Sequence, residues 1–150
     1  MNALLLAVVC YIGGFGQIDI PQGGSDARRL AGPLVRIGCS FDEESYYSLE
    51  AEAGWLENSV SIAFRALVHW QAWRVYGDLF GFSRFDPFFT AGARGDMGSC
   101  SDLAGPQCGA GFFYHLDDVW SFRFDSFATL DVNGETEMRY SFTAGLQRMF

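Results

Sequence analysis

The chain has 150 residues, which is enough for one domain and too few for two ordinary hydrophobic cores. Apolar residues make up 49% of it, aromatic residues 17% and charged residues 19%, so the composition excludes a disordered, collagen-like or heavily disulfide-linked chain. All ten basic residues are arginines, and 18 acidic residues bring the formal net charge to −8, which argues against nucleic acid as a partner. The longest apolar run, residues 3–12, is too short for a membrane-spanning helix.

The first predicted element is a strand over residues 8–20, followed by a polar connection at residues 21–29. A second interpretation makes residues 1–16 a secretory signal with a small-x-small end at Gly14-Phe15-Gly16, although no positive charge precedes its apolar core. Cleavage there would leave an odd number of strands, so the strand is favoured. We expect a single domain over residues 1–150, with residues 1–7 as a candidate remnant of a signal peptide.

From Pro33 onward, apolar and polar residues alternate in segments of about ten, which is the spacing of β-strands. Between residues 60 and 72, Ile62 and Phe64 lie on one face while Arg65 and His69 lie on the other. A helix would mix Arg65 and His69 into the apolar face, so a helical interpretation is rejected. Turn residues at 42–45, 57–58, 117–118 and 133–134 separate the segments. The further predicted strands cover residues 34–41, 47–55, 60–72, 88–96, 109–116, 120–132 and 139–150.

Alternation alone does not say which face of the strands points inward. The polar face is rich in Gly, Ser and Thr, which suit a narrow barrel interior, and the chain has no lysine for a soluble exterior. An eight-stranded barrel is also too narrow to enclose this many aromatic rings. We therefore predict an all-β protein, an eight-stranded, closed, antiparallel, up-and-down transmembrane β-barrel with its rings toward lipid. Trp55, Trp70, Trp73 and Trp120 lie near strand ends, where aromatic residues anchor such barrels at the membrane surface.

The predicted inner face carries five arginines and five acids. An arginine facing lipid near the membrane midplane costs about 2–4 kcal/mol, so these charges are expected to point inward. Inside a narrow barrel they must pair to offset the loss of water. Two interpretations follow: structural salt bridges that fill the lumen, or the lining of a conducting pore. The predicted lumen charge network consists of Arg36, Glu50, Glu52, Arg65, Arg94, Asp96, Arg123, Asp125, Asp131 and Arg139.

A family resemblance rests on the alternating strands, on the segments at residues 84–93 and 109–114, and on the terminal strand at 139–150. The chain resembles the small bacterial outer-membrane β-barrels typified by the transmembrane domain of outer-membrane protein A. The resemblance implies a place in the outer membrane of a Gram-negative-type bacterium, with outer-membrane lipid as the surroundings. It also implies that the barrel-assembly machinery reads the last strand, with Phe142, Leu146 and Phe150 as the assembly signal. Arg148 departs from the family pattern, which usually has an apolar residue two places before the terminal Phe.

The resemblance also suggests that both chain ends face the periplasm, which puts the connections at residues 21–29, 57–58, 98–107 and 133–135 outside. The turns at 42–45 and 117–118 are then periplasmic, and residues 74–86 are long for a connection on that side. Cys100 and Cys108 flank one outer connection and are candidates for a disulfide in an oxidising compartment. Cys10 and Cys39 are not expected to lie opposite each other and are interpreted as unpaired.

Both histidines, His69 and His115, fall on the predicted inner face, where hydrogen bonding in the lumen explains them. An outer-membrane lipid A deacylase of similar size uses a serine two residues after its histidine, and here those positions hold Gln71 and Asp117. We therefore expect no enzymatic activity. We also expect no cofactor and no metal site, since the histidines are far from any paired-cysteine motif.

These observations favour an integral outer-membrane barrel with a structural or surface-interaction role and a salt-bridged lumen. The first alternative is a narrow ion or small-solute channel through the same lumen. The second is a soluble ligand-binding barrel with its faces inverted. The surface partner cannot be read from the sequence.

Overall fold

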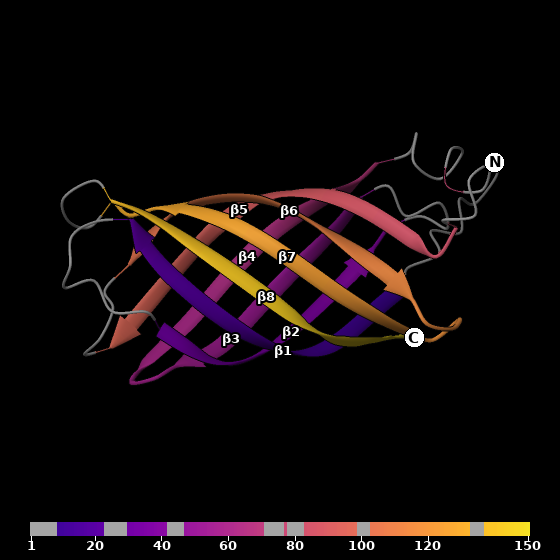
Figure 1. Ribbon diagram of the computed structural model, residues 1–150, viewed down its shortest axis with the longest axis horizontal. Coiled ribbons are helices and arrows are strands. Elements are labelled where there is room, and N and C mark those ends of the chain that lie inside the picture. Colours follow the sequence, from indigo (N-terminus) through magenta and orange to yellow (C-terminus); the bar gives the residue numbers. More distant parts are fainter. Residues whose placement is uncertain are drawn as a thin grey trace, which may run out of the picture.

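The computed structural model describes residues 9–22, 30–41, 47–70, 77, 83–98, 103–132 and 137–150, and these contain eight strands (Figure 1). Each strand pairs antiparallel with its neighbours in the sequence, and β1 pairs with β8 to close the barrel. The strands are β1 (Val9–Gln22), β2 (Leu30–Ser40), β3 (Tyr47–Leu56), β4 (Ser59–His69), β5 (Phe85–Gly98), β6 (Ala104–His115), β7 (Trp120–Leu130) and β8 (Met138–Met149). The predicted closed, up-and-down, eight-stranded barrel is confirmed.

No helix among the described residues has the length and apolar character needed to cross a membrane.

The strand bounds differ from the predicted ones mainly at two places. β2 begins at Leu30, four residues before the predicted start at residue 34. β6 begins at Ala104, so Gln107 and Cys108 lie inside a strand and not in the connection predicted for residues 98–107. Pro106 lies within β6, one residue before the first β6–β7 pair, and pairs with Ala93 of β5.

The two faces of the barrel wall are chemically opposite, and this follows directly from the alternation along each strand. Phe64 and Trp55 on the outer face are 65% and 64% exposed, whereas Arg36 and Arg123 on the inner face are 0% exposed. An apolar exterior around a polar interior is the reverse of a soluble ligand-binding barrel and is typical of a barrel surrounded by lipid. The inside-out assignment predicted from the sequence is therefore correct, and the soluble alternative is wrong.

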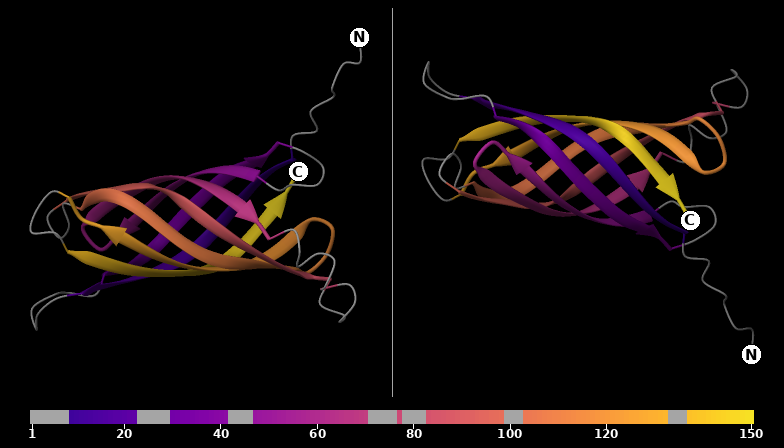
Figure 2. Two further views of the ribbon diagram at one scale, coloured as in Figure 1. Left: turned by 90° about the horizontal axis from the view of Figure 1, so that it is seen from above. Right: turned by 90° about the horizontal axis from the view of Figure 1, so that it is seen from below.

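β1 begins and β8 ends at the same end of the barrel (Figure 2), where the backbone N–H of Phe150 donates a hydrogen bond to the carbonyl oxygen of Cys10 at 2.8 Å. We call this the terminal end, and the other the opposite end. Four exposed rings from four strands or their ends gather at the terminal end: Tyr47, Trp70, Tyr114 and Trp120. Trp55 lies on β3 near the opposite end, while Trp73 lies outside the described residues.

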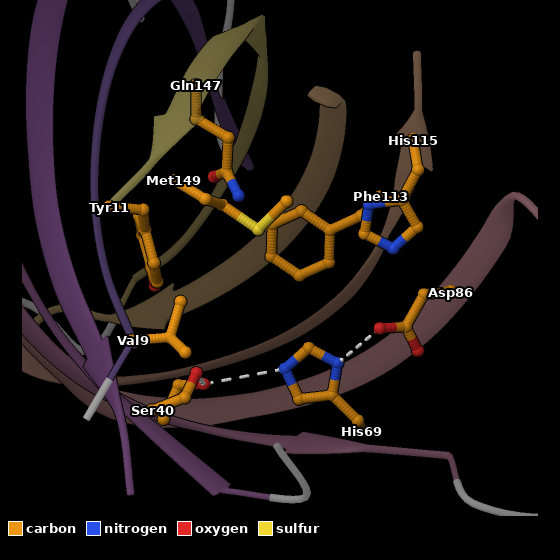
Figure 3. Close-up of a pocket in the computed structure, with 10 residues that line it drawn as sticks. Val9, Tyr11, Ser40, His69, Asp86, Phe113, His115, Gln147 and Met149 are labelled. Carbon is orange, nitrogen blue, oxygen red and sulfur yellow. Dashed lines mark hydrogen bonds and ion pairs between the residues drawn. The ribbon is translucent and has the colours of Figure 1, made fainter. Parts of the chain in front are cut away.

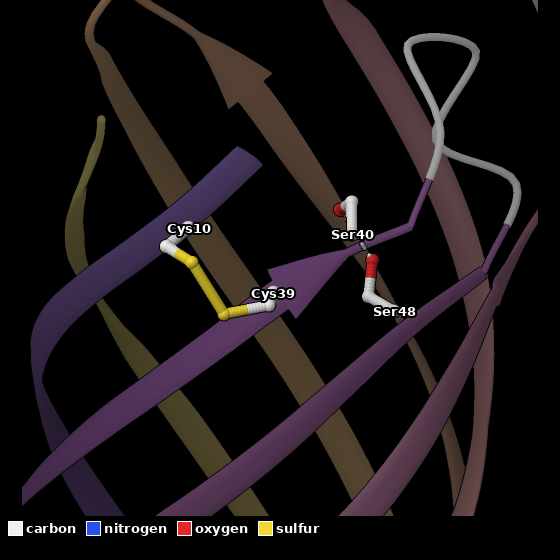
Figure 4. The surroundings of a disulfide bond; sticks show 4 residues. All are labelled: Cys10, Cys39, Ser40 and Ser48. Carbon is white, nitrogen blue, oxygen red and sulfur yellow. Dashed lines mark hydrogen bonds between the residues drawn. A yellow bond between two sulfur atoms is a disulfide. The ribbon is translucent and has the colours of Figure 1, made fainter. Parts of the chain in front are cut away.

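A disulfide joins Cys10 on β1 to Cys39 on β2 near the terminal end (Figure 4). The expectation that these cysteines are unpaired is wrong, because the β1–β2 register places them directly opposite each other with a Cα–Cα distance of 4.1 Å. Cys108 has a free thiol exposed on the outer face of β6, and Cys100 lies outside the described residues. The Cys100–Cys108 disulfide therefore stays a prediction.

Candidate functional site

The lumen is filled by side chains from alternate positions of the strands, arranged in three layers. The central cluster consists of Arg36, Glu50, Glu52, Arg65, Arg123 and Asp125. The opposite-end cluster consists of Asp19, Arg94, Asp96 and Arg139. The terminal-end pocket is lined by Val9, Tyr11, Ser40, Ser48, His69, Asp86, Phe113, His115, Gln147 and Met149.

The central cluster holds three arginines and three carboxylates, so its formal charges cancel. The Arg65 guanidinium donates two hydrogen bonds of 2.8 Å to the Glu52 carboxylate, and Arg36 contacts the same carboxylate at 2.5 Å. Arg123 contacts Asp125 at 2.8 Å. All of these side chains are at most 2% exposed, which makes the pairing essential because a buried charge without a partner is strongly unfavourable.

Two ion pairs of this cluster cross the bore of the barrel. Arg36 on β2 pairs with Asp125 on β7, and Arg123 on β7 pairs with Glu50 on β3. β7 is not a neighbour of β2 or β3 in the sheet, so these bonds connect separate parts of the wall. They span the lumen near its middle.

Aromatic rings fill the space between the guanidinium groups. The Arg65 guanidinium lies 4.1 Å from the centre of the Phe127 ring, and Arg36 lies 4.4 Å from that of Phe15. The Arg123 guanidinium lies 4.7 Å from the Phe88 ring. Contacts of this kind are favourable when the cation has lost its water. Phe127 is a buried ring among the polar inner residues of β7, and cation–π packing against Arg65 and Arg36 explains its inward position.

The opposite-end cluster is a second neutral group, with two arginines and two aspartates. Arg94 contacts Asp19 at 2.5 Å and Asp96 at 2.7 Å, and it also donates to the hydroxyl of Ser141 at 2.8 Å. Arg139 reaches Asp96 at 3.8 Å and is 18% exposed. The cluster therefore adds a second set of paired charges inside the lumen.

The terminal-end pocket has a different chemistry. His69 Nδ1 lies 2.8 Å from Asp86 Oδ2 (Figure 3). His69 Nε2 lies 3.5 Å from the Ser48 hydroxyl. Ser48 Oγ is also 2.8 Å from Ser40 Oγ (Figure 4). The His69 ring stacks on Phe113, with 5.5 Å between centroids and 11° between planes. The cavity measures about 100 Å³.

The structure brings most of the predicted lumen residues into the first two layers. Nine of the ten lie in these clusters, and the exception is Asp131, which lies just beyond β7 and accepts a hydrogen bond from the backbone N–H of Ala104 at 3.4 Å. The sequence reasoning missed Asp19 and Asp86. Both fall on the inner face of their strands, but the first strand was not divided into faces, and β5 was expected to begin only at residue 88.

The residues predicted as an assembly signal share one face of β8. Phe142 is 40% exposed, Leu146 48% and Phe150 68%, all on the outside of the barrel.

Comparison with known proteins gives similarity at the level of structure only. No protein-family model and no curated protein matches the sequence. Neisserial surface protein A (NspA) has a similar structure, with a TM-score of 0.63, 12% identity and coverage of 94% of this chain and 97% of that one. Ail, the attachment invasion locus protein of Yersinia pestis, gives a TM-score of 0.59, 8% identity and coverage of 95% and 97%. A designed transmembrane β-barrel gives 0.56, 13% identity and coverage of 93% and 95%.

These identities are low, so the similarity shows a shared fold only. The function of the chain has to be argued from its own residues. Closed antiparallel barrels with an apolar outer band and a polar interior are the membrane-spanning architecture of outer membranes. By its closed topology, its lipid-facing rings and these similar structures, the chain has the fold of the small eight-stranded β-barrels of the bacterial outer membrane.

Proposed function

We propose that the chain is a sealed outer-membrane barrel that anchors its outer connections at the cell surface and conducts no solutes. The observation that carries the proposal is the central cluster, whose ion pairs cross the bore from β2 and β3 to β7. This role requires no catalytic residue.

The channel alternative needs a continuous path for a hydrated ion. Such a path would require the Arg123–Glu50 and Arg36–Asp125 pairs to separate, and breaking one buried pair costs about 3–5 kcal/mol. The rings of Phe15 and Phe127 occupy the remaining space beside the guanidinium groups. These contacts favour the sealed barrel.

The surface role is supported by the named roles of the similar proteins, one a surface protein and the other an attachment protein. If the termini face the periplasm, the connections at the opposite end are outside. Their charged residues are six acids and two arginines: Asp26, Arg28, Arg29, Glu57, Asp102, Asp131, Glu135 and Glu137. Ail was crystallised with a heparin analogue, a polyanion. The acidic balance here favours a cationic partner instead.

Assembly of the barrel is proposed to use the last strand. Phe142, Leu146 and Phe150 are exposed in one row along β8, where a second protein can contact them before the barrel closes onto β1.

Planar-bilayer recording tests the sealed lumen. The purified barrel, inserted at high density in 1 M KCl, is expected to give no reproducible conductance steps. Insertion is checked on vesicles of the same lipid, in which an inserted barrel resists protease. If the protease check confirms insertion, conductance steps of uniform size would overturn the proposal and favour the channel.

A further inference from the structure

The terminal-end pocket contains three residues whose types and order of contact match a serine hydrolase. Asp86 contacts the Nδ1 side of His69 (Figure 3). Ser48 lies on the Nε2 side of the same ring. An aspartate at Nδ1 holds the imidazole with its Nε2 lone pair toward the serine, which is the arrangement that lets histidine take the serine proton. We propose that Ser48, His69 and Asp86 form a catalytic triad that hydrolyses short-chain acyl esters.

The triad is assembled from three strands, so no local motif could have revealed it. Ser48 is the second residue of β3, His69 ends β4 and Asp86 is the second residue of β5. All three positions meet at the terminal end because the strands are antiparallel neighbours. The three side chains are buried, and stacking on Phe113 fixes the plane of the His69 ring. The Ser48–His69 distance of 3.5 Å is long for a hydrogen bond, but such contacts commonly tighten when substrate binds.

A second, independent feature of the pocket points to a ligand. Gln147 is 2% exposed and projects into the cavity, and its side-chain oxygen has no hydrogen-bond partner among the described residues (Figure 3). A buried polar atom without a partner is costly. A hydrogen-bond donor on a bound molecule or on the hydrolytic water would satisfy it.

The size and lining of the cavity define the substrate class. At about 100 Å³ it is smaller than the 300–1,000 Å³ typical of drug-sized ligands, so only a small acyl group fits. Val9, Phe113 and Met149 supply apolar contacts for that group. The Ser40 hydroxyl, 2.8 Å from Ser48 Oγ, is positioned to donate to the oxygen that becomes negative during attack.

The reaction balances with water as the only co-reactant. Ser48 Oγ attacks the ester carbonyl while its proton passes to His69 Nε2, and the alcohol leaves with that proton. The acyl group then resides on Ser48. Water attacks this acyl-serine, giving its proton to His69, and the carboxylic acid leaves as Ser48 recovers its proton.

Hydrolysis of p-nitrophenyl acetate by the detergent-purified barrel tests the proposal, with p-nitrophenyl octanoate as the long-chain comparison. We expect the acetate ester to be cleaved faster than the octanoate. Ser48→Ala and His69→Gln should each lower the rate by about 100-fold or more. Ser61→Ala is the matched control, because Ser61 is also a buried lumen serine, but on β4 away from the pocket. It should leave the rate unchanged.

A second measurement needs no variant and therefore does not depend on how the variants fold. Wild-type barrel treated with a fluorophosphonate should gain one covalent adduct, which peptide mass spectrometry places on Ser48. A Ser48→Ala barrel that keeps the acetate rate, or a wild-type barrel with no adduct on Ser48, would overturn the proposal. Neither result bears on conductance, so the sealed-lumen proposal is tested separately.

Discussion

Substitution of Arg123 is the most direct test of charge pairing in the central cluster. Arg123 pairs with Glu50 across the bore and with Asp125 at 2.8 Å, and its guanidinium lies over the Phe88 and Phe113 rings. Arg123→Met keeps most of the volume but leaves three carboxylates facing two arginines. Breaking a buried ion pair from one side costs about 3–5 kcal/mol, and we expect a loss of this size in the free energy of unfolding.

Glu50→Gln unbalances the charge of the central cluster in the opposite direction, because three arginines then face two carboxylates. Its single cost should also be about 3–5 kcal/mol, since Glu50 contacts Arg123, Arg65 at 3.1 Å and Arg36 at 3.7 Å. The double variant restores neutrality. Its loss is therefore expected to be smaller than the sum of the two single losses, by about 1–3 kcal/mol.

The assay is reversible urea unfolding in phospholipid vesicles, followed by tryptophan fluorescence and analysed by linear extrapolation. Arg148→Met is the matched control, because Arg148 is exposed on β8 and should change stability by no more than about 0.5 kcal/mol. An Arg123→Met loss below about 1 kcal/mol, or a double variant whose loss equals the sum, would refute the reasoning that these charges neutralise one another in a dry lumen.

Three further predictions concern the wall and its ends. Phe124→Arg puts a charge on the outer face of β7 and should cost about 2–4 kcal/mol and block insertion, whereas Ser121→Ala should still insert; vesicle protease protection distinguishes them. Cys39→Ser opens the disulfide that spans 29 residues and should lower stability by about 3–4 kcal/mol in urea unfolding, and a loss near zero would contradict this. The backbone N–H groups of Val119 and Trp120 donate to the Asp117 carboxylate and lower its pKa. The ionised carboxylate therefore stabilises the folded barrel above the ordinary aspartate pKa, and this stabilisation is lost as the pH falls through the lowered pKa. Asp117→Ala should therefore destabilise the barrel at pH 7, and the difference from wild type should shrink below about pH 4; a constant difference would argue against this cause.

The alternation of residues predicted the strands and their two faces, and the volume of the aromatic rings with the cost of a lipid-facing arginine predicted which face points inward. Side chains on a strand point alternately to its two sides, so Arg65 and Phe64 must lie on opposite faces whatever the register. Register was not predictable in the same way. It depends on how each connection closes, so the pairing of Cys10 with Cys39 was missed.

The candidate site was predictable only in part, for a similar reason. Alternation within single strands puts Arg36, Glu50 and Asp125 on the polar face, and the cost of exposing charge to lipid turns that face inward. That His69 meets Ser48 and Asp86 depends on the register of β3, β4 and β5 together. A search for residues next to a histidine in the sequence could not find partners that lie 17 and 21 positions away.

Nuclear Overhauser contacts between detergent acyl chains and leucine methyl groups test the arrangement of the wall most directly, because they report which side chains meet hydrocarbon without any substitution. Leu49 is 55% exposed and Leu67 is fully buried on the neighbouring strand, so one residue type samples both faces. We predict acyl-chain contacts for the methyl groups of Leu49 and Leu146 and none for those of Leu67. Acyl-chain contacts at Leu67 with none at Leu49 would contradict the account.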